Sequence, residues 1–259
     1  MTLRVGSLFT GIGGMDLGLE RAGMEIVWMA EPNYYRQRVL KKHWPDVHLY
    51  DYVEDIHRPK PIDVLCGGPP CQPISVAGRR NGAKDERWLW HEFARIIGIT
   101  EPRWVIIENV PRLRIDGLHE ILRDLALCGY DAEWDHLSAR SFGAPHKRER
   151  CFVVAYPTFR GRKKATRVFK EPGSIEHAPD PASIAGCGFQ PRQSKGKVGK
   201  TGSRKATGAG WWRNEPDVAR MVYGLPYRVD RNTALGNSVV PFKTEWIGRQ
   251  IMRIESHAV

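Results

Sequence analysis

Short apolar segments alternate with longer, helix-like segments through the first 156 residues of this 259-residue chain. The apolar runs have the length of buried strands, and they are 3–9, 26–30, 64–66, 104–107 and 151–155. The segments between them have helical patterns and end near glycine or proline in most cases; they are 14–22, 33–43, 87–99 and 118–127. Strands that alternate with helices predict an α/β fold with a largely parallel sheet.

The middle of the chain has a different composition. Between 157 and 210, Gly, Pro, Ser, Lys and Arg dominate, and large apolar residues are too few to form an independent core. Regular patterns resume at Trp211, and the segments 218–223 and 244–254 are predicted helices. We therefore expect a first domain over 1–156, an irregular region over 157–214, and a C-terminal segment over 215–259 that returns to the first domain.

The excess positive charge of the chain, +11 in total, is concentrated in the irregular region. Residues 1–156 contain 21 Lys and Arg against 21 Asp and Glu, whereas residues 157–210 contain 12 against 3. A neutral body with one basic segment favours a polyanionic ligand such as nucleic acid, because each neutralised phosphate releases counterions. A solvated basic loop is the alternative interpretation.

The five cysteines are odd in number, widely spaced and without a CxxC pair, which indicates neither a disulfide framework nor a zinc site. No metal is therefore expected, and reduced thiols fit a cytoplasmic protein. The first nine residues lack a basic segment followed by an apolar run, and nowhere do about 18 apolar residues follow one another. We expect neither export nor a membrane span.

Glycine and polar residues gather where four of the predicted strands end. The first strand runs into residues 9–14, the second stops at Glu31, the segment 64–66 runs into 67–72, and the strand at 104–107 ends in Glu108 and Asn109. Ligands of open α/β sheets bind beyond the carboxyl ends of the strands. These ends therefore predict one site.

The first of these ends has the pattern of a nucleoside site. A strand, a glycine turn and a helix are followed by an acid, Glu31, at the distance where a carboxylate accepts ribose hydroxyls. The dinucleotide fingerprint GxGxxG is not met, because Asp16 stands where its third glycine belongs. An adenosine-containing ligand without a pyrophosphate fits this pattern, and a tight turn without any ligand is the alternative.

Cys71 lies in a segment that prolines hold rigid. Pro69, Pro70 and Pro73 prevent a regular helix around it and favour an extended or turn conformation. A thiol presented in this way acts as a nucleophile where nearby positive charge favours the thiolate. The alternative is a buried, inert cysteine, which is what we expect for Cys66 within its strand.

Glu108 follows the apolar run 104–107 and so emerges from a buried strand. Partial desolvation there raises the pKa of a carboxyl group and lets it donate a proton near neutrality. A helix-capping or ion-paired carboxylate is the alternative.

Together these residues resemble the DNA cytosine-5 methyltransferases, whose motifs occur here in the family's order. FxGxGG corresponds to 9–14, the ribose acid to Glu31, the Asp-Ile pair near the adenine to 55–56, PPCQ to 69–72, ENV to 108–110, QxRxR to 146–150 and GNxVxP to 236–241. The resemblance covers 3–156 and roughly 215–254. It implies a Rossmann-like methyltransferase fold with a mixed, mostly parallel sheet and helices on both faces. It also implies a catalytic domain over 1–156 that binds S-adenosylmethionine (SAM), and a target-recognition region over 157–214.

The resemblance assigns roles residue by residue. The implied SAM-binding residues are Phe9, Thr10, Gly11, Ile12, Gly13, Gly14, Glu31, Pro32, Asp55, Ile56, Gly68, Pro70, Leu89, Asn237, Ser238 and Val239. The implied catalytic residues are Cys71, Glu108, Arg148 and Arg150. The implied contacts to the substrate are Pro69, Gln72, Ser75, Asn109, Lys163, Lys164 and Arg167.

The implied reaction is methylation of carbon 5 of cytosine in double-stranded DNA, as in restriction-modification systems, with S-adenosylhomocysteine (SAH) as the other product. The Cys71 thiolate would add to carbon 6, Glu108 would hold ring nitrogen 3, and Arg150 would contact the base. The base must first rotate out of the duplex. We expect the protein to act as a monomer.

Two departures from the family pattern concern specificity. His146 stands where the family has glutamine, and the region 157–214 aligns with no known recognition region, so its base contacts are not assigned. One alternative is a tRNA cytosine-5 methyltransferase, although Ser75 fits the DNA-acting pattern. The other is a catalytically silent DNA-binding relative, against which the joint presence of Cys71, Glu108 and Arg150 argues.

Overall fold

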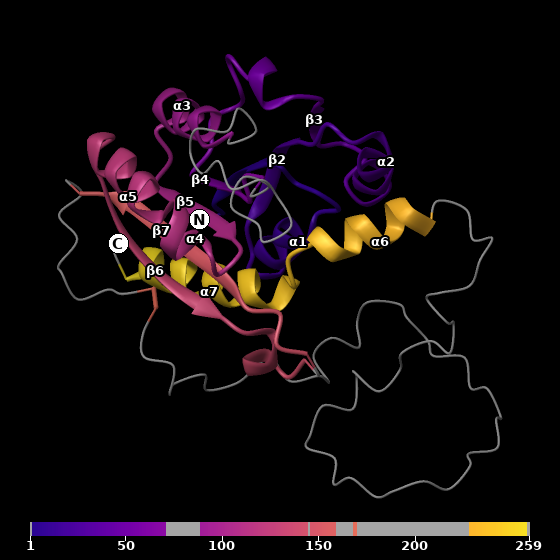
Figure 1. The fold of residues 1–259 in the computed structure, drawn as a ribbon. Coiled ribbons are helices and arrows are strands. Elements are labelled where there is room, and N and C mark those ends of the chain that lie inside the picture. The colour runs from indigo at the N-terminus through magenta and orange to yellow at the C-terminus, as the bar shows by residue number, and fades with distance from the viewer. Residues whose placement is uncertain (1, 71–88, 145, 159–167, 170–227, 258–259) are drawn as a thin grey trace, which may run out of the picture.

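A computed structural model of the chain describes residues 2–70, 89–144, 146–158, 168–169 and 228–257. These residues form a seven-stranded sheet with helices on both faces (Figure 1). The strands are β1 (Arg4–Leu8), β2 (Glu25–Ala30), β3 (His48–Tyr50), β4 (Val64–Gly67), β5 (Trp104–Asn109), β6 (Tyr130–Leu137) and β7 (Arg150–Pro157). The α-helices are α1 (Gly14–Arg21), α2 (Tyr34–His43), α3 (Trp90–Thr100), α4 (Leu113–Asp116), α5 (Leu118–Leu127), α6 (Arg228–Asn237) and α7 (Pro241–Ser256). Short 3-10 helices lie at η1 (Val53–Asp55) and η3 (Ala139–Phe142).

The strand order is β3-β2-β1-β4-β5-β7-β6. The pairs from β3 to β5 are parallel, whereas β7 is antiparallel to both β5 and β6. From β1 the chain builds outward to β2 and β3, and then returns to add β4 on the other side of β1. The carboxyl ends of β1 and β4 therefore lie side by side where the order reverses, which is where open sheets of this kind bind ligands.

Alternate side chains of each strand enter two separate apolar cores. In β4, Val64 and Cys66 face the helices α1 and α7, whereas Leu65 faces α3 and α5. Cys66 is fully buried, as expected for a cysteine within a strand. Because both faces are covered, the central strands are rich in apolar residues, which is why they could be recognised in the sequence.

The C-terminal helix α7 packs directly on α1, the first helix of the chain (Figure 1). Two glycines allow the close approach. A Cβ at Gly18 would lie 2.0 Å from Thr244 Oγ1 and 2.3 Å from the carbonyl oxygen of Pro241, and a Cβ at Gly248 would lie 2.7 Å from the Ala22 Cβ. The end of the chain is thereby held against the glycine loop that precedes α1.

The five predicted strands and the helices at 14–22, 33–43, 118–127 and 244–254 are confirmed. The helix expected over 87–99 begins at Trp90 among the described residues, and the helix expected over 218–223 lies outside them. β3, β6, η1, η3, α4 and α6 were not predicted. The sequence did not predict β6 because charged residues interrupt its apolar pattern. β6 is the edge strand beside β7 and is partly exposed along most of its length.

Two residues of the basic region are described beyond the end of β7 and its following turn, and they dock on the sheet. The backbone N–H groups of Val168 and Phe169 donate to the Glu133 carboxylate of β6 at 2.9 and 3.3 Å. The Val168 side chain is fully buried in the core beneath α7, and Phe169 packs against it. No helix in the described ranges is long and apolar enough to cross a membrane.

Replacing Gly18 and Gly98 by alanine should change stability in opposite directions. Gly18→Ala forces α1 and α7 apart and should lower the free energy of unfolding by about 1–3 kcal/mol. Gly98 in α3 is exposed, and a Cβ there meets nothing within 4 Å, so Gly98→Ala should raise it by about 0.5–1 kcal/mol through helix propensity. Urea unfolding measures both, and equal effects would contradict the packing described for α1 and α7.

Candidate active site

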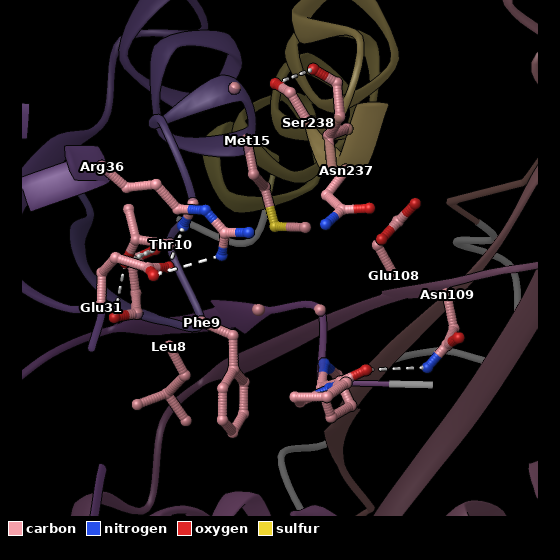
Figure 2. A pocket seen from close by; sticks show the side chains of 18 of the residues that line it. Leu8, Phe9, Thr10, Met15, Glu31, Arg36, Glu108, Asn109, Asn237 and Ser238 are labelled. Atoms are coloured by element: carbon pink, nitrogen blue, oxygen red, sulfur yellow. Dashed lines mark hydrogen bonds and ion pairs between the residues drawn. The ribbon is translucent and has the colours of Figure 1, made fainter. Parts of the chain in front are cut away.

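A cavity of about 480 Å³ lies at the carboxyl ends of β1, β4 and β5, beside the start of α1 and the connection between α6 and α7 (Figure 2). Its described lining consists of Ser7, Leu8, Phe9, Thr10, Gly11, Gly14, Met15, Glu31, Pro32, Arg36, Gly67, Gly68, Pro69, Pro70, Glu108, Asn109, Val110, Arg150, Asn237, Ser238 and Val239. Its volume lies within the ~300–1,000 Å³ common for small-molecule sites. The reversal of strand order thus coincides with a real pocket.

The loop between β1 and α1 turns through left-handed backbone conformations. Phe9, Gly11 and Gly13 have φ angles of 54°, 64° and 80°, and the Gly13 N–H donates to the Thr10 carbonyl at 3.1 Å. A Cβ at Gly14 would lie 2.4 Å from the carbonyl oxygen of Val239. Glycine is therefore required both for the turn and for contact with the C-terminal segment.

Glu31, at the end of β2, is held rigidly at the cavity wall. Its Oε2 accepts the Gly11 N–H at 2.8 Å, and its Oε1 accepts the Asn33 N–H at 3.0 Å and pairs with the Arg36 guanidinium at 3.2 Å. Figure 2 shows Arg36 reaching across to this carboxylate above Phe9. The acid therefore has a fixed orientation before any ligand binds.

Glu108, at the end of β5, lies across the cavity and pairs with Arg150, which begins the antiparallel strand β7. Arg150 Nε lies 3.0 Å from Glu108 Oε1. Burial raises the pKa of Glu108, and the positive charges of Arg150, Lys243 and Arg148 only partly offset it. The carboxyl group is thus both desolvated and ion-paired, so features of both interpretations offered from the sequence occur together.

Asn109 fixes the proline segment that precedes Cys71. Its Nδ2 donates to the Pro69 carbonyl at 3.2 Å, and its Oδ1 accepts the Val110 N–H at 2.8 Å. A Cβ at Gly68 would lie 3.0 Å from Glu108 Oε2, so this glycine allows the proline segment to pass close to the acid. Cys71 itself, the next residue after the cavity-lining Pro70, lies outside the described residues.

Most of the predicted site residues that the structure describes line one cavity. It brings together Phe9, Thr10, Gly11, Gly14, Glu31, Pro32, Gly68, Pro69, Pro70, Glu108, Asn109, Arg150, Asn237, Ser238 and Val239. The described residues that line the cavity do not include Ile12, Gly13, Asp55, Ile56, Leu89 or Arg148. Gln72, Ser75, Lys163, Lys164 and Arg167 lie, like Cys71, outside the described residues.

The residues that do not line the cavity have other surroundings. Ile56 is buried in the core, where its carbonyl accepts from Arg95, and Asp55 is exposed on η1. Leu89 precedes α3, and Gly13 lies against Trp44. Among the described residues no cluster of His, Cys, Asp and Glu could hold a metal ion.

Met15 and Arg36 line the cavity without having been predicted. Both stand in the first turn of a helix that follows a strand end, Met15 in α1 and Arg36 in α2. A helix entered from the rim of a sheet directs its first turn toward that rim, and this position was the available signal.

The sequence profile of the C-5 cytosine-specific DNA methylases matches residues 3–181 of the chain. The chain belongs to this family. Its sheet of seven strands, with β7 antiparallel, is the Rossmann-like fold of these methyltransferases.

The relatives include the Type II methyltransferase M.NgoPII of Neisseria gonorrhoeae, 32% identical over 163 residues, which are 60% of this chain and 48% of the relative. M.HgiBI of Herpetosiphon aurantiacus is 38% identical over 157 residues, which are 57% of this chain and 36% of the relative. The chain thus spans about half the length, or less, of these relatives.

Solved structures show the same fold. A prophage-encoded protein of E. coli, described as a DNA modification methyltransferase, superposes with a TM-score of 0.51 at 27% identity over 60% of this chain and 47% of its own. The Dnmt2 methyltransferase of S. pombe superposes with a TM-score of 0.54 at 22% identity over 70% of this chain and 58% of its own. The second likeness concerns the fold alone.

Asp16, the residue that breaks the dinucleotide fingerprint, is buried beneath the glycine loop. Neither carboxylate oxygen has a hydrogen-bond partner among the described residues. Burial raises the pKa of Asp16 from 3.8 to about 6, and the nearby Ser7 hydroxyl offsets this only in part. Because the folded state prefers the neutral acid, ionisation of Asp16 destabilises the fold as the pH rises from about 4 through about 6.

Asp16→Asn should remove this pH-dependent cost. The free energy of unfolding of the variant, relative to the unaltered protein, should increase between pH 4 and 7 by about 3 kcal/mol, since each pKa unit corresponds to about 1.4 kcal/mol. Urea unfolding at each pH measures the difference. Asp46→Asn, at an exposed position, is the control, and a variant difference that is constant with pH would refute the assignment.

Proposed function

We propose that this chain transfers a methyl group from SAM to carbon 5 of cytosine in DNA, through a covalent adduct of Cys71. The observation that carries the proposal is the ion pair between the buried Glu108 and the partly buried Arg150, which lies in the same cavity as the glycine loop and Glu31. The wall formed by the glycine loop and Glu31 is suited to a nucleoside, and the opposite wall presents Glu108, an acid that can hold a proton. A methyl donor and a heterocyclic base would meet between them.

The cavity suits SAM in chemistry and in size. Glu31 carries a fixed carboxylate that can accept ribose hydroxyls, and Gly11 leaves open space where a side chain would intrude. The apolar Phe9 and Pro32 flank this wall. Bound there, SAM would supply a methyl group activated by its sulfonium. Asn237, Ser238 and Val239 would close the cavity from the C-terminal segment.

Glu108 and Arg150 would activate the base. Carbon 5 of cytosine is a weak nucleophile until a thiolate adds to carbon 6. As the bond between the Cys71 sulfur and carbon 6 forms, electrons move to the ring, and Glu108 would pass a proton to ring nitrogen 3. The raised pKa of Glu108 favours its protonated form, and Arg150 would stabilise the carboxylate that remains.

The remaining steps restore the base and the enzyme. Carbon 5 takes the methyl group as the methyl–sulfonium bond breaks. A solvent base then removes the proton from carbon 5, the sulfur–carbon 6 bond breaks with return of the electron pair to Cys71, and Glu108 recovers its proton from nitrogen 3. Each bond formed on the protein is thus broken again within one turnover.

The substrate must present its base outside the helix, because carbon 6 is inaccessible within a stacked duplex. Extrusion costs a few kcal/mol, which phosphate contacts can offset. The 12 basic residues of 157–210 are the proposed source of those contacts, with Lys163, Lys164 and Arg167 among them. Docking of Val168 and Phe169 on Glu133 attaches this region to the catalytic sheet.

Covalent capture by DNA that contains 5-fluorocytosine tests the proposal. Fluorine cannot leave carbon 5 as a proton does, so with SAM present the protein should form an adduct that survives denaturing electrophoresis. Cys71→Ser should form none. Glu108→Gln should form it about a hundredfold more slowly, since it cannot donate a proton.

Cys128→Ser is the matched control, because Cys128 is an exposed, free cysteine away from the cavity. This variant should be captured as fast as the unaltered protein. Capture of Cys71→Ser at the rate of Cys128→Ser would rule out the proposed nucleophile.

A further inference from the structure

Lys243, in the first turn of α7, is fully buried, although lysine is almost never buried without a specific partner. Its Nζ donates to the Arg148 carbonyl at 2.5 Å. Lys243 does not line the cavity. Its contact is with Arg148, two residues before the cavity-lining Arg150, so any effect on the cavity passes through this segment.

The carbonyl that Lys243 binds belongs to a strained residue. Arg148 has a φ angle of 28°, which a residue with a side chain rarely adopts and which persists only where surrounding contacts maintain it. Two residues later, Arg150 begins β7 and reaches Glu108. The conformation at Arg148 therefore determines how the chain enters the catalytic strand.

A second connection runs in the opposite direction between the same two segments. The Arg148 guanidinium donates to the carbonyls of Gly236 and Ser238, at the end of α6 and in its connection to α7. The backbone of Arg148 is thus held from α7, and its side chain holds the segment that lines the cavity through Asn237, Ser238 and Val239.

Four charged groups surround the Lys243 ammonium. Arg148 and Glu149 face it from the segment before β7, Arg150 from β7 and Glu108 from β5. Burial and the two arginines lower the pKa of Lys243 to about 8, and the two glutamates oppose them. Arg148, Arg150 and Lys243 therefore place three positive charges around Glu108. Of these three groups, Lys243 loses its charge near pH 8.

A purely structural side chain would not need this charge. Replacing a buried ionic group by an apolar one of similar volume is often neutral or stabilising, because the cost of burying the charge disappears. The cost of burying the Lys243 ammonium group is better explained by its contact with the Arg148 carbonyl.

We infer that Lys243 is a positioning residue of the proposed methyl-transfer site: its ammonium group holds the strained carbonyl of Arg148 so that Arg150 meets Glu108 at the cavity. The geometric part of this inference stands on the contacts alone. Its catalytic consequence rests on the proposed function.

Lys243→Met tests the inference, because methionine fills a similar volume without charge or donor. Hydrogen–deuterium exchange of the amides of residues 146–150 needs no substrate, and it should quicken about tenfold or more once the carbonyl contact is lost. Arg253→Met, at an exposed position of the same helix, is the matched control and should leave this exchange unchanged.

Kinetics then separate positioning from general stability. In Lys243→Met, kcat on DNA should fall about tenfold to a hundredfold while the Kd for SAH stays within about twofold. For the unaltered protein kcat should fall as the pH rises through about 8, where Lys243 loses its proton, and this decline should be absent from the variant. The decline in the unaltered protein can be measured even if the variant folds poorly.

Unchanged exchange at 146–150 in a folded Lys243→Met protein would overturn the inference. So would a variant with full kcat and the same alkaline decline. If the unaltered protein binds SAH but methylates no cytosine, the proposed function fails, and the exchange measurement alone then decides whether Lys243 holds the segment.

Discussion

The ion pair between Glu108 and Arg150 is the interaction on which the site depends. It joins the end of a parallel strand, β5, to the start of an antiparallel one, β7, and so ties the parallel part of the sheet to the segment 146–150. An isolated buried carboxyl group would stay neutral, and an exposed one would ionise fully. Burial beside Arg150 gives Glu108 both properties that the proposed chemistry needs, a raised pKa and a partner for the negative charge.

The cavity exists because both ends of the chain meet over the sheet. Gly18 and Gly248 let α7 lie close against α1, and Gly14 lets the connection before α7 touch the first turn of α1. Residues as distant as Ser7 and Val239 consequently line the same pocket. Two buried charged groups lie there at a cost in stability: Asp16, whose carboxylate has no hydrogen-bond partner among the described residues, and Lys243, whose ammonium group lies near the Glu108–Arg150 pair.

Sequence reasoning found what depends on local pattern. Strands buried on both faces are rich in apolar residues, so β1, β4 and β5 were recognised, and the residues at their ends were correctly placed at one rim. It missed β6, whose charged residues hide a half-exposed edge strand, and it missed the 3-10 helices. Lys243 could not be found in this way, because its partner Arg148 lies 95 residues earlier and meets it only after α7 has docked. The role of Cys71 rests on its motif and remains a prediction.

The most direct measurement follows the methyl group itself. The protein is incubated with SAM that carries a trideuterated methyl group and with duplex DNA or tRNA, and the polymers are digested to nucleosides for mass spectrometry. The predicted product is 2′-deoxycytidine labelled at carbon 5, formed with DNA and absent with Glu108→Ala. Label on the exocyclic nitrogen of cytosine, label confined to tRNA, or no label in either polymer would contradict the proposed reaction.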